Sequence, residues 1–255
     1  MADPRSDSEI ARDLATSAGQ LLVKLRSDLG FSDPWKLRDA GDHNSNVHLL
    51  ELFAEVRPDD IVLSEESADD QRRLEADRVW IIDPLDGTTE YGEPDRTDWA
   101  VHVALWQRGR GLTDGAVALP ARGVTLSTAE ALPTRGEPAS HPRLAVSRTR
   151  RPPWVVDVAE TVSGQLVPIG SAGMKAMSIV LGETDAYLHS GRMKEWDSAA
   201  PVVVAAAAGL HVSQLDGSAL EFNKPSRLTE QLLICHPSLT DSLVAAASKA
   251  HPPPK

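Results

Sequence analysis

The segment VWIIDPLDGTTEY (residues 79–91) runs from apolar residues directly into two carboxylates, Asp83 and Asp86, three positions apart. Side chains at this spacing in a turn after a strand can converge on one point, and Pro84 stiffens the turn because its ring fixes φ. Two unpaired carboxylates in a partly buried site repel each other and raise each other's pKa. A divalent cation relieves that repulsion. Because the nearby ligands are oxygens only, with no Cys or His pair, Mg²⁺ fits better than Zn²⁺.

The residues after these carboxylates suit a phosphate group. Gly87 has no Cβ to obstruct a ligand, and Thr88 and Thr89 are hydroxyl residues suited to a helix N-terminus, where free N–H groups bind phosphate. The segment is therefore predicted to form a metal-and-phosphate turn. The alternative is a structural Asp-Pro turn in which Thr88 serves only as a helix N-cap.

Two further acidic segments bear on this choice. VLSEES places Glu65 and Glu66 at the end of another predicted strand, and EWDSAAP places Asp197 at a predicted helix N-terminus. Taken alone, the two glutamates would read as exposed loop acids and Asp197 as an N-cap. Together the three segments match one signature, which makes three separate structural explanations improbable.

Those segments, LSEES, WIIDPLDGTTEY and EWDSAAPVVVAAAAG, resemble the three motifs of the inositol monophosphatase superfamily of Mg²⁺-dependent, lithium-sensitive phosphatases. The resemblance extends from about Ser6 to Ala246. Within the superfamily, GSAGMKAMSIVLGETDAYLHS and EWDSAAP are most similar to the 3′-phosphoadenosine 5′-phosphate (PAP) phosphatases, or 3′(2′),5′-bisphosphate nucleotidases, in their actinobacterial form. The resemblance implies hydrolysis of the 3′-phosphate of PAP to AMP and phosphate. It also implies a layered αβαβα sandwich with the site between two halves.

The resemblance assigns metal ligands residue by residue. Glu65, Asp83 and the carbonyl of Leu85 are similar to the ligands of a first Mg²⁺, and Asp83, Asp86 and Asp197 to those of a second, with Asp83 bridging. A weaker third ion is implied near Glu65. The four carboxylates sum to a charge of −4, which two Mg²⁺ neutralise, and a phosphate dianion then explains why a third ion is recruited. Lithium is implied as an inhibitor that replaces the second Mg²⁺.

The catalytic roles follow in the same way. Gly87 and Thr88 are similar to the backbone donors that hold the phosphate, and the Thr88 hydroxyl to the group that orients a metal-activated water, paired with Asp42. The resemblance also implies that Glu65 is a catalytic residue in addition to a metal ligand. The inositol-type enzymes carry Val-Thr shortly before that aspartate, whereas this chain has RDAGDHNSN, so the Asp42 assignment departs from the pattern. Asp86 and Asp197 are implied to contact the substrate as well.

Substrate choice depends on the cations of the second half. Lys175 matches a lysine that PAP phosphatases place near the nucleotide, and Arg148 belongs to a cluster, SRTRRPP, that could hold a second phosphate. A solvated basic loop is the alternative for the cluster. His189 and Arg192 either line the pocket or are merely exposed. His102 lies on a predicted central strand and is expected to be a core histidine.

Composition limits the partners. The chain has 255 residues and a net charge of −11, which argues against nucleic acid polymers and anionic membranes as ligands. The expected partner is a small phosphorylated substrate, and the oligomeric state is left open, with a homodimer as one option. The single cysteine, Cys235, permits no intrachain disulfide. With no signal peptide or membrane span in view, a cytoplasmic location is expected.

The elements that must position these residues fall into two predicted halves, 1–135 with the metal and phosphate motifs and 136–255 with Asp197 and the substrate side. The first half is predicted to contain helices over 6–29 and 42–56, strands at 61–63, 79–82 and 98–106, and further strands at 115–120 and 124–128 that form an antiparallel meander. The strand at 98–106 is apolar on both faces and is expected to be central. A Pro-rich connection spans 130–142. Strands and helices then alternate, which is typical of α/β proteins: strands at 143–147, 166–169 and 185–189 and helices at 154–163, 171–181 and 197–209.

Three other activities occur within the superfamily that the chain resembles and are alternatives to PAP hydrolysis: inositol monophosphatase, fructose-1,6-bisphosphatase and histidinol-phosphatase. A candidate from another class is a non-catalytic metal-binding regulatory protein. A binding protein has no need of a water-orienting threonine, so the presence of Thr88 beside all four carboxylates argues against it.

Overall fold

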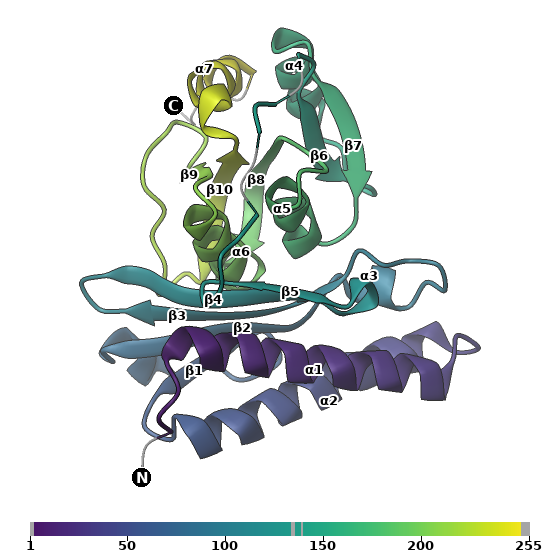
Figure 1. The fold of residues 1–255 in the computed structure, drawn as a ribbon, viewed down its shortest axis with the longest axis vertical. Coiled ribbons are helices and arrows are strands. Elements are labelled where there is room, and N and C mark those ends of the chain that lie inside the picture. Colours follow the sequence, from purple (N-terminus) through teal and green to yellow (C-terminus); the bar gives the residue numbers. More distant parts are fainter. Residues whose placement is uncertain (1–2, 134–135, 139, 251–255) are drawn as a thin grey trace.

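The computed structural model describes residues 3–133, 136–138 and 140–250. The chain forms five layers in the order helices, sheet, helices, sheet, helices (Figure 1). The predicted αβαβα sandwich is therefore confirmed. Three apolar cores hold the described layers together: one lies under α1 and α2, one surrounds α5 and α6 and contacts both sheets, and one lies under α4 and α7.

The outer layer of the first half consists of α1 (Asp7–Leu29) and α2 (Pro34–Val56). α1 begins and ends as predicted, because Ser6 and Glu9 form a capping box and Gly30 adopts a positive φ of 62°. α2 begins at Pro34, eight residues before the predicted start at residue 42. The overlooked signal is Asp33, whose carboxylate accepts the Lys36 N–H at 3.1 Å, followed by proline at the first helical position.

The first sheet has the order β1-β2-β3-β4-β5, where β1 is Ile61–Ser64, β2 Arg78–Asp86, β3 Ala100–Gln107, β4 Gly111–Leu119 and β5 Val124–Ser127. β1 pairs parallel with β2, and the remaining pairs are antiparallel. The meander and the central position of β3 are confirmed. The short helix α3 (Thr88–Tyr91) follows β2 directly, and 3₁₀ turns cover Gln71–Leu74 and Pro120–Arg122.

Alternation along β2 decides which side chains face which layer. Trp80 and Ile82 are fully buried against α1 and α2, while Val79 and Ile81 are fully buried toward α5 and α6. Each such side chain contributes about 1.5–3 kcal/mol relative to an exposed one. This burial on both faces fixes the strand register, since a one-residue slip would exchange the two sets. Asp83 continues the set that faces α5 and α6.

The second sheet has the order β7-β6-β8-β10-β9, where β6 is Arg143–Ser147, β7 Gln165–Ile169, β8 Ala186–Lys194, β9 His211–Ser213 and β10 Leu228–Cys235. α4 (Pro153–Thr161) and α7 (Thr240–Ala250) cover its outer face. β9, β10, α7 and a 3₁₀ turn at Pro237–Leu239 were not among the predicted elements. β10 was readable from its apolar LLIC run, and it lies between β8 and β9 in the sheet.

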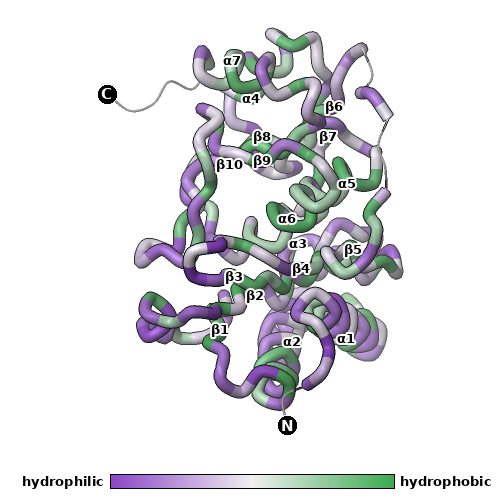
Figure 2. The backbone as a smooth tube through the Cα atoms, turned by 60° about the vertical axis from the view of Figure 1, so that its left-hand side comes forward, coloured by the Kyte–Doolittle hydropathy of each residue, from purple (hydrophilic) through white to green (hydrophobic). Residues whose placement is uncertain are grey.

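The middle layer consists of α5 (Ala172–Val180) and α6 (Glu195–Ala207), which lie between the two sheets. Both helices are apolar on most sides, as the green colour along them in Figure 2 indicates. A helix that is hydrophobic all round must be buried on all sides, and this layer provides that burial. The N-termini of both helices are the part of the layer that concerns the site.

The strands of the first sheet lie within residues 61–127 and those of the second within 143–235. Residues 134, 135 and 139 lie outside the described residues, and the proposed division at 135/136 falls among them. We keep this boundary as a proposal. No helix within the described ranges has the length and apolarity that crossing a membrane requires.

Candidate active site

A β-bulge in β2 aims both aspartates of the DPLD segment at the same side of the sheet. Asp83 pairs with His102 and Asp86 with Ala100, so two residues of β2 stand opposite one residue of β3. Without the extra residue, positions i and i+3 of a strand would point to opposite faces. The predicted strand at 79–82 followed by a turn is therefore corrected: the strand continues to Asp86 and contains the bulge.

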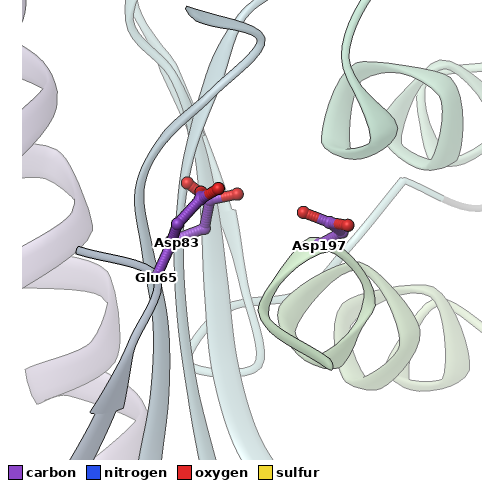
Figure 3. A group of neighbouring side chains, drawn as sticks. All are labelled: Glu65, Asp83 and Asp197. Atoms are coloured by element: carbon purple, nitrogen blue, oxygen red, sulfur yellow. The ribbon is translucent and has the colours of Figure 1, made fainter. Parts of the chain in front are cut away.

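Three carboxylates from three elements meet between the sheet and the middle layer. Glu65 follows the end of β1, which runs parallel to β2, so it lies beside Asp83. Asp197 is the third residue of α6 and approaches from the opposite side, as Figure 3 shows. One oxygen of each of these three side chains lies within 4.8 Å of the others. The structure thus brings together residues that are 132 positions apart in the sequence, from 65 to 197.

Asp86, the fourth predicted ligand, is turned toward the middle layer. Its carboxylate accepts the Ala172 N–H at 3.2 Å and the Gly173 N–H at 2.6 Å, both from the first turn of α5. The Nε2 atom of His102 lies 3.2 Å from its Oδ2. A helix N-terminus favours an anion, which explains the attraction. Asp86 therefore borders the three-carboxylate cluster and also ties β2 to α5.

The electrostatics of the cluster call for a cation. Desolvation of the carboxyl group, and then the neighbouring carboxylates, raise the pKa of Glu65 to about 7 although this residue is partly open to solvent, and the same causes raise the pKa of the buried Asp83 well above its ordinary value. The same causes raise the pKa of Asp197 to about 6. Among residues 3–133, 136–138 and 140–250, no Lys or Arg forms an ion pair with any of the three. An oxygen-only donor set with uncompensated charge fits Mg²⁺.

Asp86 behaves differently from the other three carboxylates. Burial would raise its pKa, but the facing His102 and the Gly173 N–H outweigh burial, so the pKa of Asp86 is lowered. Asp86 is thus the member of the set that stays ionised without a metal.

These shifts predict a pH-dependent stability for the metal-free protein. The raised pKa values mean that the folded protein binds more protons than the unfolded chain between about pH 4 and pH 7. Its free energy of unfolding therefore falls as pH rises through that window. Mg²⁺ replaces these protons, so the gain in Tm on adding ~10 mM MgCl₂ is expected to be larger at pH 8 than at pH 5.5. Thermal unfolding in EDTA and in MgCl₂ at the two pH values measures this gain in Tm, with NaCl of equal ionic strength as control. An equal gain in Tm at pH 5.5 and pH 8 would contradict the prediction.

The predicted phosphate turn adjoins the carboxylates. Gly87 has φ 86°, and a Cβ built there would lie 2.8 Å from the Cβ of Ser171, so both backbone and space require glycine. Thr88 begins α3, and its hydroxyl lies 3.2 Å from Oδ1 of Asp42 and 3.2 Å from the carbonyl oxygen of Leu85. The structure therefore brings Thr88 and Asp42 together despite the missing Val-Thr pair.

Because α2 begins at Pro34, Asp42 lies within this helix and not at its first residue. Its carboxylate faces Thr88. Burial raises the pKa of Asp42 to about 7, and the nearby carboxylate of Glu66 adds to the effect. When ionised, Asp42 can only accept a hydrogen bond, so the Thr88 hydroxyl donates to it. The threonine oxygen then keeps lone pairs that can accept a further hydrogen bond.

A cavity of about 580 Å³ opens from the site toward the second half. Its lining includes Gly87 and the acidic Asp86, Glu90 and Asp197, together with cationic, aromatic and imidazole side chains: Arg150, Trp154, Lys175, Tyr187, His189 and Arg192. His189 and Arg192 thus line the pocket, and Arg192 is also exposed. Burial lowers the pKa of His189 to about 4, so its imidazole is neutral at physiological pH.

Lys175 is a buried cation at the wall of this pocket. Its ammonium donates to the carbonyl oxygens of Gly170 at 2.6 Å and Ser171 at 2.8 Å, and it lies 5.3 Å from the Tyr187 ring centroid. Burial lowers its pKa, while Asp86 and other nearby carboxylates oppose that change. Lys175 therefore supports the loop before α5 and adds positive charge to the pocket.

Arg148 is engaged elsewhere. Its guanidinium pairs with Glu90 at 2.9 Å and with Glu93 at 2.8 Å, and it is not among the pocket-lining residues. Its neighbour Arg150 is exposed and lines the pocket. The geometry therefore disfavours the sequence-based assignment of Arg148 to substrate binding and points to Arg150. The reason is that two acidic residues of the first half already satisfy Arg148.

Sequence reasoning also missed two contributors to the site. His102, expected to be a core residue, contacts Asp86, and the amides of Ala172 and Gly173 hold the same carboxylate. Backbone donors carry no residue-type signal. His102 is fully buried, as expected, but its contact with Asp86 depends on the bulge that follows Asp83 in β2.

A cluster of three carboxylates thus lies between the first sheet and the middle helical layer, beside the predicted phosphate turn. Solved structures share this fold. A staphylococcal inositol monophosphatase II superposes with a TM-score of 0.76 at 18% identity, covering 95% of each chain. Mycobacterium tuberculosis SuhB superposes with a TM-score of 0.72 at 24% identity, covering 96% of each chain. At these identities the likeness concerns the fold alone.

The sequence comparison identifies the family. The profile of the inositol monophosphatase family matches residues 6–252, and the chain belongs to this family. It is similar to the 3′-phosphoadenosine 5′-phosphate phosphatase of Mycobacterium tuberculosis, with 48% identity over 240 residues, 91% of this chain and 90% of the relative. The M. leprae protein of that name is 46% identical over 94% of this chain and 92% of its own. The Escherichia coli 3′(2′),5′-bisphosphate nucleotidase CysQ is 31% identical, covering 82% and 91%.

Proposed function

We propose that this protein is a Mg²⁺-dependent phosphomonoesterase that hydrolyses the 3′-phosphate of PAP, giving AMP and phosphate, in sulfur assimilation and nucleotide recycling. The observation that carries the proposal is that the three-carboxylate cluster meets, at Asp197, a cavity whose lining also includes separate cations. One phosphate needs a metal site and the other needs a cation, and this cavity offers both. The identity of 46–48% to proteins named PAP phosphatases supports the same substrate.

Two to three Mg²⁺ ions are proposed. Glu65, Asp83 and the Leu85 carbonyl would hold the first, and Asp83, Asp86 and Asp197 the second, with Asp83 shared. When bound, such ions supply an activated water and stabilise the leaving ester oxygen. The raised pKa values of Glu65 and Asp197 support the assignment, because a cation would relieve the repulsion that causes them.

The chain's own groups orient the reactants. The ionised Asp42 carboxylate accepts a hydrogen bond from the Thr88 hydroxyl, and the threonine oxygen is proposed to accept a hydrogen bond from the attacking water. Glu65 lies beside Asp83 in the cluster and is proposed to face the same water. The N–H groups of Gly87 and Thr88 are proposed to donate to the phosphate oxygens, since they lie at the turn between β2 and α3.

The second phosphate of PAP is proposed to contact Arg150, with Arg192 and Lys175 adding positive charge. Arg150→Ala is expected to lower kcat/KM for PAP about tenfold, because a charge-assisted contact to phosphate contributes roughly 1.5–3 kcal/mol and Arg150 is exposed. Hydrolysis of adenosine 3′-phosphate, which lacks the 5′-phosphate, should change little. Steady-state kinetics with both substrates measures the effect. Arg150 is a cleaner test than Lys175, whose ammonium already supports two carbonyls.

Arg151→Ala provides the matched control for that comparison. Arg151 is an exposed neighbour with the same charge but is not among the pocket-lining residues, so its removal should leave both substrates unaffected. If Arg150→Ala slows both substrates equally, or if Arg151→Ala matches it on PAP, then the proposed contact is wrong.

Lithium sensitivity is proposed for the second metal position. A monovalent ion among Asp83, Asp86 and Asp197 would supply half the charge of Mg²⁺, so it should stabilise the leaving ester oxygen less and slow turnover. Activity is expected to fall with millimolar LiCl and not with matched NaCl or KCl. Equal inhibition by all three salts would indicate an effect of ionic strength only.

Phosphate release from a panel of substrates tests the proposed function. PAP, inositol 1-phosphate, fructose 1,6-bisphosphate and histidinol phosphate are compared by kcat/KM at saturating Mg²⁺. PAP is expected to be hydrolysed most efficiently. A preference for inositol 1-phosphate would replace the nucleotidase proposal with that of an inositol monophosphatase. No turnover of any substrate, with Mg²⁺ still bound, would favour a non-catalytic regulatory protein.

A further inference from the structure

His102 is a fully buried side chain in the centre of the first sheet that faces the metal site. It lies on β3 opposite Asp83 and points toward the middle layer. Its Nδ1 is 3.0 Å from the carbonyl oxygen of Trp196, and its Nε2 is 3.2 Å from Oδ2 of Asp86. Trp196 directly precedes Asp197. One imidazole ring therefore contacts one proposed metal ligand and the residue next to another.

The contact with Trp196 sets the orientation of the ring. A carbonyl oxygen can only accept a hydrogen bond, so Nδ1 must carry a proton and donate to Trp196. This bond joins β3, in the first half, to the first turn of α6, in the second half. The Nε2 contact with Asp86 is close but lacks the direction of a full hydrogen bond. The Nδ1 bond is therefore the stronger of the two restraints.

Gly173 packs against the imidazole ring of His102 at Nε2. A Cβ at Gly173 would overlap Nε2 of His102 and would lie 3.0 Å from Oδ2 of Asp86. The Gly173 N–H donates to the same oxygen at 2.6 Å. The first turns of α5 and α6 thus meet at this ring, which leaves Asp86 little freedom relative to Asp197. A residue that only filled core volume would not need polar contacts on both nitrogens.

We propose that His102 is a positioning residue that fixes the separation of Asp86 and Asp197, and so preorganises the second metal position. The inference rests on the proposed Mg²⁺-dependent function. Asp86 and Asp197 come from different halves of the molecule, and no covalent constraint sets their distance. A ligand pair held in place loses less entropy when the ion binds than a pair that must first be ordered.

Two conservative variants separate the contacts of the ring. The amide nitrogen of Asn can take the place of Nδ1, so His102→Asn keeps the bond to Trp196. The longer Gln can reach Asp86 in place of Nε2 but gives up Trp196. His102→Leu keeps approximate volume and loses both contacts. We expect the dissociation constant of the weaker Mg²⁺ to rise about tenfold in the Gln and Leu variants and less than threefold in the Asn variant, with the tighter ion unaffected.

Calorimetric titration of the EDTA-treated protein with MgCl₂ measures this order directly, without reference to turnover. In kinetics, the Mg²⁺ concentration for half-maximal rate should rise in the same order, while kcat at saturating Mg²⁺ recovers in the Asn variant. Variants that lower Tm in EDTA but bind both ions like wild type would overturn the inference and leave His102 a packing residue. Wild type that binds no divalent ion would instead overturn the proposed function, and this inference with it. If the Leu variant fails to fold, the difference in Mg²⁺ affinity between the Asn and Gln variants still tests the inference.

Discussion

Asp197→Asn is expected to lower kcat for PAP by at least about 10³-fold, equivalent to roughly 4 kcal/mol of the barrier. The substitution keeps the shape of the side chain and an oxygen to accept the Lys194 N–H, which the carboxylate now accepts at 3.0 Å. The helix should therefore remain intact. What is lost is one negative charge of the cluster, and with it the second metal position. Asp86→Asn is expected to have an effect of the same order.

Measurement of kcat together with thermal unfolding separates lost chemistry from lost folding. The Asp197→Asn protein should unfold in EDTA at a Tm no lower than wild type, because removing a charge relieves the repulsion that raises the pKa of Glu65. Glu75→Gln is the control, since Glu75 is an exposed acid of the first half that lies outside the three-carboxylate cluster. Near-normal Mg²⁺-dependent turnover by Asp197→Asn would show that Asp197 is not a metal ligand.

Thr88→Val is expected to lower kcat about 10²–10³-fold with little change in Mg²⁺ affinity. Valine matches the size of threonine but has no hydroxyl, so it can neither bond to Asp42 nor orient the attacking water. A positioned general acid or base contributes about 10²–10⁴-fold to the rate. Thr88→Ser, which retains a hydroxyl, should stay within about tenfold of wild type. Asp42→Asn should behave like Thr88→Val, because the two groups act as one unit.

Thr88→Val should leave Mg²⁺ binding unchanged, whereas Asp197→Asn should weaken it. Thr88 contacts the Leu85 carbonyl as well, so a weaker first metal position would indicate that the hydroxyl supports the ligand set and does not orient water. A Thr88→Val protein with near-normal kcat would remove Thr88 and Asp42 from the catalytic machinery.

The layered fold was predictable because most of its signals are local. The capping box at Ser6, the apolar strands and the alternation after residue 142 each depend on residues close in sequence. The early start of α2 was equally local but was overlooked at Asp33 and Pro34. The bulge between Asp83 and Asp86 was not predictable, since it is defined only by the pairing of β2 with β3. It decides that both aspartates face the middle layer.

Residue types in the site were predictable, but their partners were not. Carboxylates at 65, 83 and 197 were singled out from motifs, and the structure brings them within 4.8 Å of one another. In contrast, Arg148 has two acidic partners from a distant segment, and nothing in SRTRRPP distinguishes it from Arg150. His102 shows the same limit, because a histidine in an apolar strand has the pattern of a core residue whether or not it faces a metal site.

Product analysis of a single PAP hydrolysis reaction tests the central claim most directly. PAP is incubated with the protein and Mg²⁺, and the nucleotide product is separated and identified as adenosine 5′-phosphate or adenosine 3′-phosphate. The carboxylate cluster acting on the 3′-phosphate, with Arg150 near the 5′-phosphate, predicts adenosine 5′-phosphate and phosphate in equal amounts, and no reaction in EDTA. Formation of adenosine 3′-phosphate, or turnover that persists in EDTA, would contradict it.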